Sequence, residues 1–456
     1  MKEKIVILGS GESGVGAAIL AVQKHDDVFV SDLGIIPSNT KQKLDELGVA
    51  FEEKKHTFDL IKKADTVVKS PGIPDNTPLI MDLIAQGVVV ISEIEFAFRH
   101  IAPNAKIIGI TGTNGKTTTA LLTYHLLKEA GLDVALAGNV GYSLAKRVAE
   151  KNYDFYVIEI SSFQLDGIIQ FKPDISILLN ITPDHLDRYH QDFKKYVASK
   201  FRMVENVTAA SSFIYCADSI AVDEQVNRRN IAASLFAVSA NPHSKKGAFI
   251  DKDHLIFNFE YQEKKDRIPL ADIPLIGRHN LINAMSSALC ALMLEIPIKK
   301  VLEGMKSFKN APHRLEMVAE IDQVKFINDS KATNVDAVYY ALEGIKEPII
   351  WIAGGIDKGN DYSILDQWVA QKVKGIVCLG IDNTKIENHF RGKVPFLGRA
   401  SSTREAIQSA WEIASAGDVV LLSPACASFD LFINYEDRGD QFKEAVGSLN
   451  LKLASI

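Results

Sequence analysis

The chain has 456 residues, which is too long for one hydrophobic core, so its length predicts about three domains. Hydrophobic residues make up 47% and charged residues 24% of the sequence, as is ordinary for soluble globular proteins. The formal net charge is −6 and no basic stripe is visible, which argues against a nucleic-acid partner. No apolar run reaches the length of about 18 residues that spans a bilayer, so we expect no membrane insertion.

The N-terminal sequence MKEKIVILGSGESGVGAAIL has a charged start and an apolar run, as a signal peptide does. Its glycines cut the apolar run short, so the segment favours a strand, a turn and a helix. The four cysteines form no C-x-x-C pair and no zinc or disulfide spacing. We therefore expect reduced thiols and a cytoplasmic location. The cysteines are Cys216, Cys290, Cys378 and Cys426.

Short apolar runs alternate with helical patterns along almost the whole chain. The strand-like runs are, in chain order, residues 4–8, 28–32, 64–70, 88–92, 105–110, 155–161, 175–180, 325–330, 348–355, 375–380 and 418–425. This alternation is typical of parallel α/β sheets that helices cover on both faces. The segment 247–262 differs, because two alternating runs flank Asp251–Asp253 and predict a β-hairpin.

Loop-rich breaks at residues 99–105 and 308–314 are candidate domain boundaries. We therefore predict an α/β fold in three domains, namely a Rossmann-like domain at 1–98, a central P-loop ATPase-type domain at 99–310 and a Rossmann-like C-terminal domain at 311–456. The central domain would contain a parallel sheet and carry the small β-hairpin. No internal repeat and no low-complexity tract is visible in the sequence.

A glycine-rich turn follows the first strand-like run. Gly9, Gly11 and Gly14 fit the pattern G-x-G-x-x-G, whose glycines let the backbone approach a phosphate at a helix N-terminus. Asp32 ends the second run, where an acidic side chain can hold a ribose hydroxyl. Ser70 ends the third run, at the sheet edge where such folds bind ligands. Two alternatives remain open, a structural turn without a ligand and an NAD or FAD site.

The segment GITGTNGKTTTA, residues 109–120, is similar to a phosphate-binding loop. It has Ile110 where the pattern G-x-x-x-x-G-K-[ST] would place its first glycine. A strand-like run precedes it and a helical pattern follows it, as a phosphate loop requires. Backbone N–H groups and Lys116 would contact the β- and γ-phosphates, and the Thr117 hydroxyl would bind Mg²⁺. A fortuitous G-K-T is the alternative, and the flanking pattern favours ATP binding over it.

Three further side chains indicate metal chemistry. Glu159 follows an apolar run, where a buried carboxylate is costly unless a cation pairs with it. His185 lies just beyond the next strand-like run and is a tolerable Mg²⁺ ligand when oxygen ligands assist. Lys200 follows in the segment ASKFR. Considered singly, His185 fits a packed loop histidine and Lys200 fits a charge on the surface of a helix.

Nine segments in one order carry a resemblance to a known family: TGTNGKTTT, GNVG, EISSFQL, NITPDHLDRY, GRHNLINAMSSA, APHRLE, NDSKATN, GGIDKG and SPACASFD. They resemble the Mur ligases, ATP-dependent amino-acid ligases that build the peptide stems of peptidoglycan. NDSKATN and SPACASFD are similar to the branch that adds D-glutamate to UDP-N-acetylmuramoyl-L-alanine. The family's loop reads T-G-T-N-G-K-[ST], so Ile110 is normal there.

Other functions explain fewer of these segments. A sibling ligase that adds another amino acid, or a folylpolyglutamate-type ligase, shares the loop and the histidine–lysine pair. Such ligases should lack the combination of DSKATN and SPACASFD. A dinucleotide-dependent oxidoreductase leaves TGTNGKT unexplained, and a nucleotide-binding switch needs no second set of metal ligands.

The resemblance assigns roles to matching positions of this chain. The implied ATP contacts are Gly112, Thr113, Asn114, Gly115, Lys116, Thr117, Thr118, Asn280, Asn283, Arg314, Asp329 and Lys331. The implied contacts of the uridine-nucleotide substrate are Ser13, Asp32, Ser70, Gly72, Asn139 and Gln164. D-glutamate would contact Thr333, Lys358, Ser428 and Tyr435, the last at a position where the family often has phenylalanine. Two Mg²⁺ ions would be held by Thr117, Glu159, His185 and Lys200, the last as a carbamate derived from CO₂. The implied catalytic residues are Lys116, Glu159, His185 and Lys200.

The resemblance also implies a reaction. The L-alanine carboxylate of the substrate attacks the γ-phosphate of ATP, and the amine of D-glutamate attacks the resulting acyl phosphate, which releases phosphate. The Mg²⁺ ions would screen the charges of the two anions. The segment 311–314 would act as a hinge that lets the third domain close over ATP. We expect a monomeric cytoplasmic enzyme of peptidoglycan biosynthesis.

Overall fold

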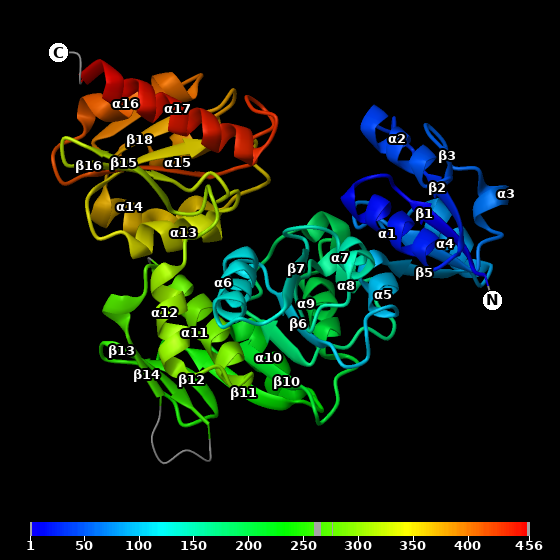
Figure 1. Cartoon of the computed structure of the whole chain (residues 1–456). Helices are drawn as coiled ribbons and strands as arrows, with labels where there is room; N and C mark the ends of the chain where they lie inside the picture. Colours follow the sequence, from blue (N-terminus) through cyan, green and yellow to red (C-terminus); the bar gives the residue numbers. More distant parts are fainter. Residues whose placement is uncertain (1, 260–265, 276, 454–456) are drawn as a thin grey trace. The chain divides into compact units, whose positions relative to one another are not determined.

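The structure is a computed structural model that describes residues 2–259, 266–275 and 277–453. The chain divides into two compact units, Met1–Ile273 with Ile282–Phe308, and Pro274–Leu281 with Lys309–Ile456. The first unit holds two sheets and the second holds one (Figure 1). None of the helices in the described ranges combines the length and the apolar character that crossing a bilayer requires.

The N-terminal sheet has five parallel strands in the order β3-β2-β1-β4-β5. The strands are β1 (Lys4–Leu8), β2 (Asp27–Ser31), β3 (Ala50–Glu52), β4 (Thr66–Lys69) and β5 (Val89–Ser92). The helices are α1 (Glu12–Gln23), α2 (Ser38–Glu46), α3 (Phe58–Ile61), α4 (Pro78–Ala85) and α5 (Glu93–Phe98). The strand order reverses between β1 and β4, which is where doubly wound sheets bind ligands. The predicted Rossmann-like architecture is confirmed here.

The second sheet has nine strands in the order β14-β13-β12-β11-β10-β9-β6-β8-β7. They are β6 (Lys106–Thr111), β7 (Val134–Gly138), β8 (Phe155–Glu159), β9 (Ile175–Leu178), β10 (Ser212–Cys216), β11 (Ser234–Ser239), β12 (Gly247–Asp251), β13 (His254–Asn258) and β14 (Asp266–Pro269). The pairs from β7 to β12 are parallel, and β12 to β14 are antiparallel. The predicted hairpin is confirmed as β12 and β13, and residues 260–262 of its predicted segment lie outside the described ranges.

Helices flank this second sheet (Figure 1). The α-helices are α6 (Lys116–Glu129), α7 (Leu144–Glu150), α8 (Ser162–Leu165), α9 (Phe193–Phe201), α10 (Ile220–Arg228), α11 (Arg278–Met293) and α12 (Ile298–Ser307). Three short 3₁₀ helices are η1 (Leu186–Tyr189), η2 (Arg202–Val204) and η3 (Leu270–Asp272). The unit boundary crosses α11, whose first residues belong to the second unit.

Close packing of α1 against α7 joins the first two sheets in one hydrophobic core. Gly16 on α1 has no room for a side chain, because an added Cβ would lie 1.8 Å from the Ser143 hydroxyl. The buried Glu95 carboxylate accepts three backbone N–H groups of the loop at 169–171 at 2.8 to 2.9 Å. These contacts explain why both sheets fall in one unit. The boundaries after residues 98 and 310 stay predictions.

The sheet of the second unit has six strands in the order β15-β16-β20-β17-β18-β19, parallel except for β15. The strands are β15 (Glu316–Ile321), β16 (Val324–Asn328), β17 (Ile349–Gly354), β18 (Val373–Leu379), β19 (Phe396–Ala400) and β20 (Val419–Ala425). The helices are α13 (Val335–Gly344), η4 (Tyr362–Leu365), α14 (Asp366–Lys372), α15 (Thr384–Phe390), α16 (Thr403–Ile413) and α17 (Tyr435–Leu453). Helices α13 and α14 pack on one face and α16 and α17 on the other (Figure 1). This arrangement confirms the predicted α/β class of the C-terminal part.

Candidate active site

The phosphate loop joins the end of β6 to the start of α6. Two of its glycines have positive φ angles, +152° at Gly112 and +86° at Gly115. A Cβ on Gly115 would lie 2.4 Å from the side-chain oxygen of Asn283, so this helix start requires glycine and Asn283 packs directly against it. Ile110 is fully buried within β6 and pairs with Glu159. The loop therefore begins after Ile110, and a glycine is not needed at that position.

Asn180, two residues after the end of β9, holds the phosphate loop through hydrogen bonds to its backbone. Its side-chain oxygen accepts from the backbone N–H of Asn114 at 2.9 Å, and its side-chain amide donates to the Asn114 carbonyl at 3.0 Å. Its backbone carbonyl accepts from the Thr113 N–H at 2.7 Å. Asn180 was missed in the sequence reasoning, although it opens the segment NITPDHLDRY.

Two lysine side chains converge on one carbonyl of the loop. Lys116 Nζ donates to the carbonyl oxygens of Gly112 and Thr113, each at 2.9 Å. Lys200 Nζ donates to the same Gly112 carbonyl at 2.8 Å. Lys200 is only 1% exposed, so the alternative of a surface charge is wrong. Burial, and then the nearby Lys116 charge, hold the pKa of the Lys200 amine well below its usual value.

The Glu159 carboxylate lies buried at the end of β8, and only one of its two oxygens has a hydrogen-bond partner in the described residues. Its Oε1 atom accepts from the side-chain amide of Asn139 at 2.9 Å. Its Oε2 atom has no hydrogen-bond partner within residues 2–259, 266–275 and 277–453. An orphaned buried carboxylate oxygen is costly unless a cation meets it. The site therefore fits the predicted Mg²⁺ at Glu159 and at Thr117, whose side chain is buried at the start of α6.

His185 lies just before η1 in a left-handed backbone conformation, with φ of +51°. Its side chain is 46% exposed, and its ring meets the Phe163 ring edge to face at 5.2 Å. Its Nε2 atom is 3.6 Å from the Asp184 carboxylate. Across the described part of the chain, no three His, Cys, Asp or Glu side chains form a ready-made metal cluster. A second ion would therefore need an oxygen ligand from another source, such as a carbamate on Lys200.

A cavity of about 250 Å³ gathers several of the predicted residues. From the sequence prediction it is lined by Gly72, Lys116, Asn139, His185 and Lys200. Asp184, Arg188 and Tyr196 also line it and were not predicted. The Tyr196 hydroxyl lies 3.1 Å from the Thr113 hydroxyl, so it also contacts the loop. The first unit therefore places members of three candidate sets, for phosphate, metal and the uridine substrate, around one cavity. Other members do not line it, among them Thr117, Glu159, Ser13, Asp32, Ser70 and Gln164.

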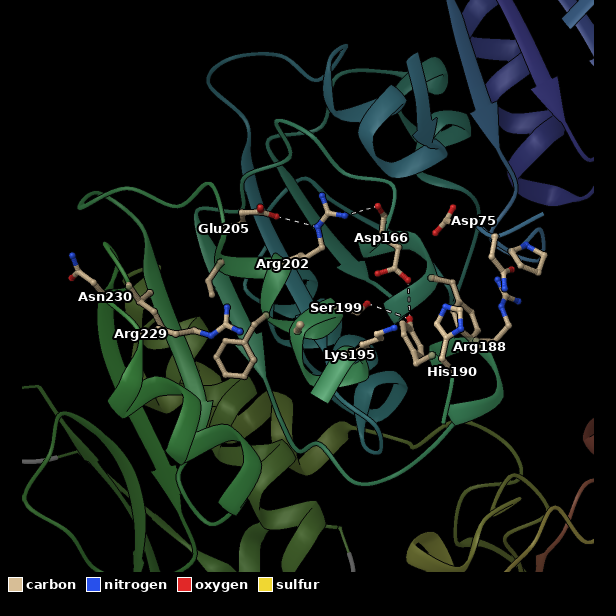
Figure 2. A pocket seen from close by; sticks show the side chains of 18 residues that line it. Asp75, Asp166, Arg188, His190, Lys195, Ser199, Arg202, Glu205, Arg229 and Asn230 are labelled. Carbon is tan, nitrogen blue, oxygen red and sulfur yellow. Dashed lines mark hydrogen bonds and ion pairs between the residues drawn. The ribbon is translucent and has the colours of Figure 1, made fainter. Parts of the chain in front are cut away.

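A larger cavity of about 860 Å³ contains none of the predicted residues (Figure 2). Phe163 and Arg188 line both cavities. Figure 2 shows Arg202 between Glu205 and Asp166, where it donates to the Glu205 carboxylate at 3.0 Å. Its charge is thus already matched within the protein. The smaller cavity is therefore the one that contains residues from the sequence prediction.

In the N-terminal sheet, Asp32 is already engaged by the protein. Its carboxylate accepts from the Ser10 N–H at 2.7 Å, from the Ser10 hydroxyl at 2.6 Å and from the Gly34 N–H at 2.8 Å. Burial opposes these hydrogen bonds, which nevertheless lower the pKa of Asp32. Two further residues predicted for the uridine substrate are half-buried in the same N-terminal part. Ser13 lies at the start of α1, and Ser70 directly follows β4.

Gln164 has a visible structural use. Its side chain forms a capping box with Ser161 at the start of α8, where Gln164 Oε1 accepts from the Ser161 N–H at 2.9 Å. Such a box satisfies helix N–H groups without any ligand. Its predicted contact with the uridine substrate stays a prediction.

Several predicted residues of the second unit follow the ends of β16 and β20, whereas Asn280 lies on α11, Arg314 precedes β15 and Lys358 follows β17. Asp329 is buried, and it accepts from the Ser423 hydroxyl at 2.8 Å and from the Leu315 N–H at 3.2 Å. Burial raises the pKa of Asp329 to about 7. Lys331 Nζ donates to the Tyr435 hydroxyl at 2.8 Å and lies 4.6 Å from the centre of its ring. The remaining predicted residues here are Asn280 and Ser428, which are buried, Arg314 and Thr333, which are half-buried, and Lys358, which is exposed.

Three family models match the chain in order. They are the Mur ligase MurD-like N-terminal domain at residues 3–92, the Mur ligase middle domain at residues 110–291 and the Mur ligase glutamate ligase domain at residues 313–426. The UDP-N-acetylmuramoylalanine–D-glutamate ligase of Christiangramia forsetii is 48% identical over 98% of this chain and 100% of its own length. The enzyme of the same name from Porphyromonas gingivalis is 47% identical over 99% of both chains.

Solved structures support the same fold at lower identity. MurF from Acinetobacter baumannii superposes with a TM-score of 0.63 at 14% identity, over 96% of this chain and 93% of that one. A pseudomurein peptide ligase type C from Methanothermus fervidus gives a TM-score of 0.62 at 19% identity, over 98% and 100%. Taken with the family models and the relatives of high identity, they show that this chain belongs to the Mur ligase family.

Proposed function

We propose that this chain is an ATP-dependent ligase that joins D-glutamate to UDP-N-acetylmuramoyl-L-alanine in the cytoplasmic stage of peptidoglycan biosynthesis. Relatives named for this activity align with nearly the whole chain. The observation that carries the proposal is the convergence of Lys116 and Lys200 on the Gly112 carbonyl, next to the half-satisfied Glu159. The protein is proposed to act as a monomer.

ATP is bound by the phosphate loop in this proposal. The N–H groups at the start of α6 and the Lys116 ammonium hold the β- and γ-phosphates. The L-alanine carboxylate then attacks the γ-phosphorus, the bond to the β-phosphate oxygen breaks, and ADP leaves. Two unit negative charges about 4 Å apart repel by about 4 kcal/mol at an effective dielectric of 20. Fixed positive groups around the cavity offset this repulsion.

The burial of Lys200 favours its conversion to a carbamate. The depressed pKa favours the neutral amine, which is the form whose nitrogen would bond to the carbon of CO₂ with release of a proton. The product is an anionic oxygen ligand in place of a neutral amine. Its negative charge would attract the nearby Lys116 ammonium.

Mg²⁺ would be held by Thr117 and Glu159, and a second ion by His185 and the carbamate of Lys200. When bound, these ions supply charge neutralisation to the phosphoryl oxygens. The residues around them have their own tasks. Asn139 holds the Glu159 carboxylate in place through its 2.9 Å hydrogen bond, and Asn180 keeps the phosphate loop in shape.

The second unit would supply the amino-acid site. Thr333, Lys358, Ser428 and Tyr435 are the proposed contacts of D-glutamate, and Lys358 offers an exposed positive charge to one of its carboxylates. The amine of D-glutamate attacks the carbonyl carbon of the acyl phosphate. A C–N bond forms, the C–O bond to phosphate breaks, and the amine loses a proton.

A phosphate-release assay tests this function. The wild-type protein is supplied with UDP-N-acetylmuramoyl-L-alanine, ATP and Mg²⁺, and with D-glutamate, L-glutamate, L-lysine or L-alanine in separate reactions. We expect release above background with D-glutamate alone. Turnover with L-lysine but not with D-glutamate would assign the chain to a sibling ligase instead.

A further inference from the structure

Arg438 is a charged side chain that neither the resemblance nor the site prediction used. It belongs to the N-terminal part of α17 and is 1% exposed, among the largest fully buried side chains. Its Nε donates to the Ser330 hydroxyl at 3.0 Å and one terminal nitrogen donates to the Ser330 carbonyl at 2.8 Å. The other terminal nitrogen donates to the Cys426 carbonyl at 3.3 Å. In the described part of the second unit, none of its hydrogen bonds reaches a carboxylate.

These three hydrogen bonds join three segments of the proposed site. Ser330 stands between Asp329 and Lys331, which are assigned to the nucleotide. Cys426 stands two residues before Ser428, which is assigned to D-glutamate. Arg438 itself fixes the start of α17 to both. A single planar group thus links the segment after β16, the segment after β20 and the helix that carries Tyr435.

Ser330 extends this connection toward Lys331. Its hydroxyl accepts from Arg438 and donates to the Tyr435 carbonyl at 2.8 Å. The Tyr435 hydroxyl in turn accepts from Lys331 Nζ at 2.8 Å. The position of the Lys331 ammonium therefore depends, through Tyr435 and Ser330, on the guanidinium of Arg438.

Burying a cation whose hydrogen bonds go only to neutral groups costs free energy, and the nearby Asp430 carboxylate offsets only part of that cost. Burial lowers the pKa of Arg438 to about 10, which reflects the cost of removing its charge from water. An apolar side chain would pack at lower cost. Only arginine offers a rigid planar fork that can reach two carbonyls and a hydroxyl at once. The geometry of these three hydrogen bonds, rather than the filling of space, therefore explains why an arginine stands at this position.

We propose that Arg438 is a positioning residue, which sets the spacing between the nucleotide segment at 329–331 and the D-glutamate segment at 426–428. This inference rests on the proposed function. Lysine at this position keeps the charge but cannot make the three hydrogen bonds together. The segments at 329–331 and 426–428 then lose the hydrogen bonds to one shared side chain that connect them. The proposed contacts of the uridine substrate all belong to the first unit and do not depend on it.

Steady-state kinetics of Arg438→Lys test the proposal. We expect the KM for D-glutamate to rise about tenfold, equivalent to about 1.4 kcal/mol, while the KM for UDP-N-acetylmuramoyl-L-alanine stays unchanged. Arg404→Lys is the matched control, since Arg404 is exposed on α16, and both KM values should stay at the wild-type level. A structural role alone would lower the folded fraction and leave the KM values of the folded enzyme as they are.

A second variant covers the case in which Arg438→Lys does not fold. Ser330→Ala removes the acceptor of Nε and the donor to the Tyr435 carbonyl, and it leaves the two hydrogen bonds from Arg438 to carbonyls. We expect a rise of about threefold in the same KM. Unchanged KM values for D-glutamate in the folded variants would overturn the proposal. If the wild type itself fails to turn over D-glutamate, the proposed function fails, which is a different result.

Discussion

Asn180 gives the sharpest prediction, because the structure shows its contacts and the sequence did not single it out. Asn180→Ala removes two hydrogen bonds to the backbone of Asn114, at 2.9 and 3.0 Å. Each net side-chain hydrogen bond contributes about 1 kcal/mol, so the loop loses about 2 kcal/mol of stabilisation. If ATP requires the ordered loop, its Kd should rise about 30-fold.

The assay is calorimetric titration with a nonhydrolysable ATP analogue, together with thermal unfolding without nucleotide. Asn206→Ala is the matched control, since Asn206 also makes two side-chain hydrogen bonds to backbone carbonyls, those of Ile169 and Phe171 at 2.9 and 3.1 Å. The control should lose a similar amount of stability and keep its affinity for the analogue. An Asn180→Ala protein with wild-type affinity, or equal weakening in both variants, would refute the bracing role.

Three further predictions concern ionisable groups. Lys200→Ala should reduce phosphate release at least about a hundredfold, and short-chain carboxylic acids should restore part of it whereas bicarbonate should not; full activity would remove the carbamate from the account. Glu93→Gln tests the cost of a buried carboxyl group. Burial raises the pKa of Glu93 from 4.5 to about 7, so the free energy by which Glu93 destabilises the fold grows as the pH rises between these two values. The variant should gain up to about 3 kcal/mol in urea unfolding above about pH 7 and nothing below about pH 4.5, and equal gains at both would contradict this. Tyr435→Phe removes the hydroxyl that accepts from Lys331 Nζ at 2.8 Å, and we expect kcat to fall about fivefold. An unchanged kcat would show that this hydrogen bond does not contribute to catalysis.

Local sequence patterns predicted the parallel sheets because buried strands here are nearly continuous apolar runs. All four predicted runs of the first hundred residues lie on strands β1, β2, β4 and β5. The predicted runs missed β3 and β7, which are short or rich in small residues, and they also missed β10, β11, β14, β15 and β19. Their pairing partners in the sheet stabilise them, and such long-range pairing is not visible in a local pattern.

Side-chain partners were harder to predict than element positions. Glu159 was predicted from its place after an apolar run, and its orphaned oxygen agrees with that reasoning. Lys200, considered singly, fitted a surface helix, because the amphipathic pattern of α9 does not reveal that this side chain points into the protein. Asn180 and Arg438 were missed because their roles depend on backbone groups that lie far away in the sequence. Hydrogen bonds to such distant backbone groups leave no trace in local residue spacing.

The transfer of an isotope tests the central claim most directly. The claim is that the substrate carboxylate becomes an acyl phosphate before the amide forms. We propose to label both carboxylate oxygens of the L-alanine in UDP-N-acetylmuramoyl-L-alanine with ¹⁸O, and to analyse the phosphate released by the wild-type protein with ATP and D-glutamate. The account predicts one labelled oxygen in each phosphate released. Unlabelled phosphate formed alongside the amide product would contradict it.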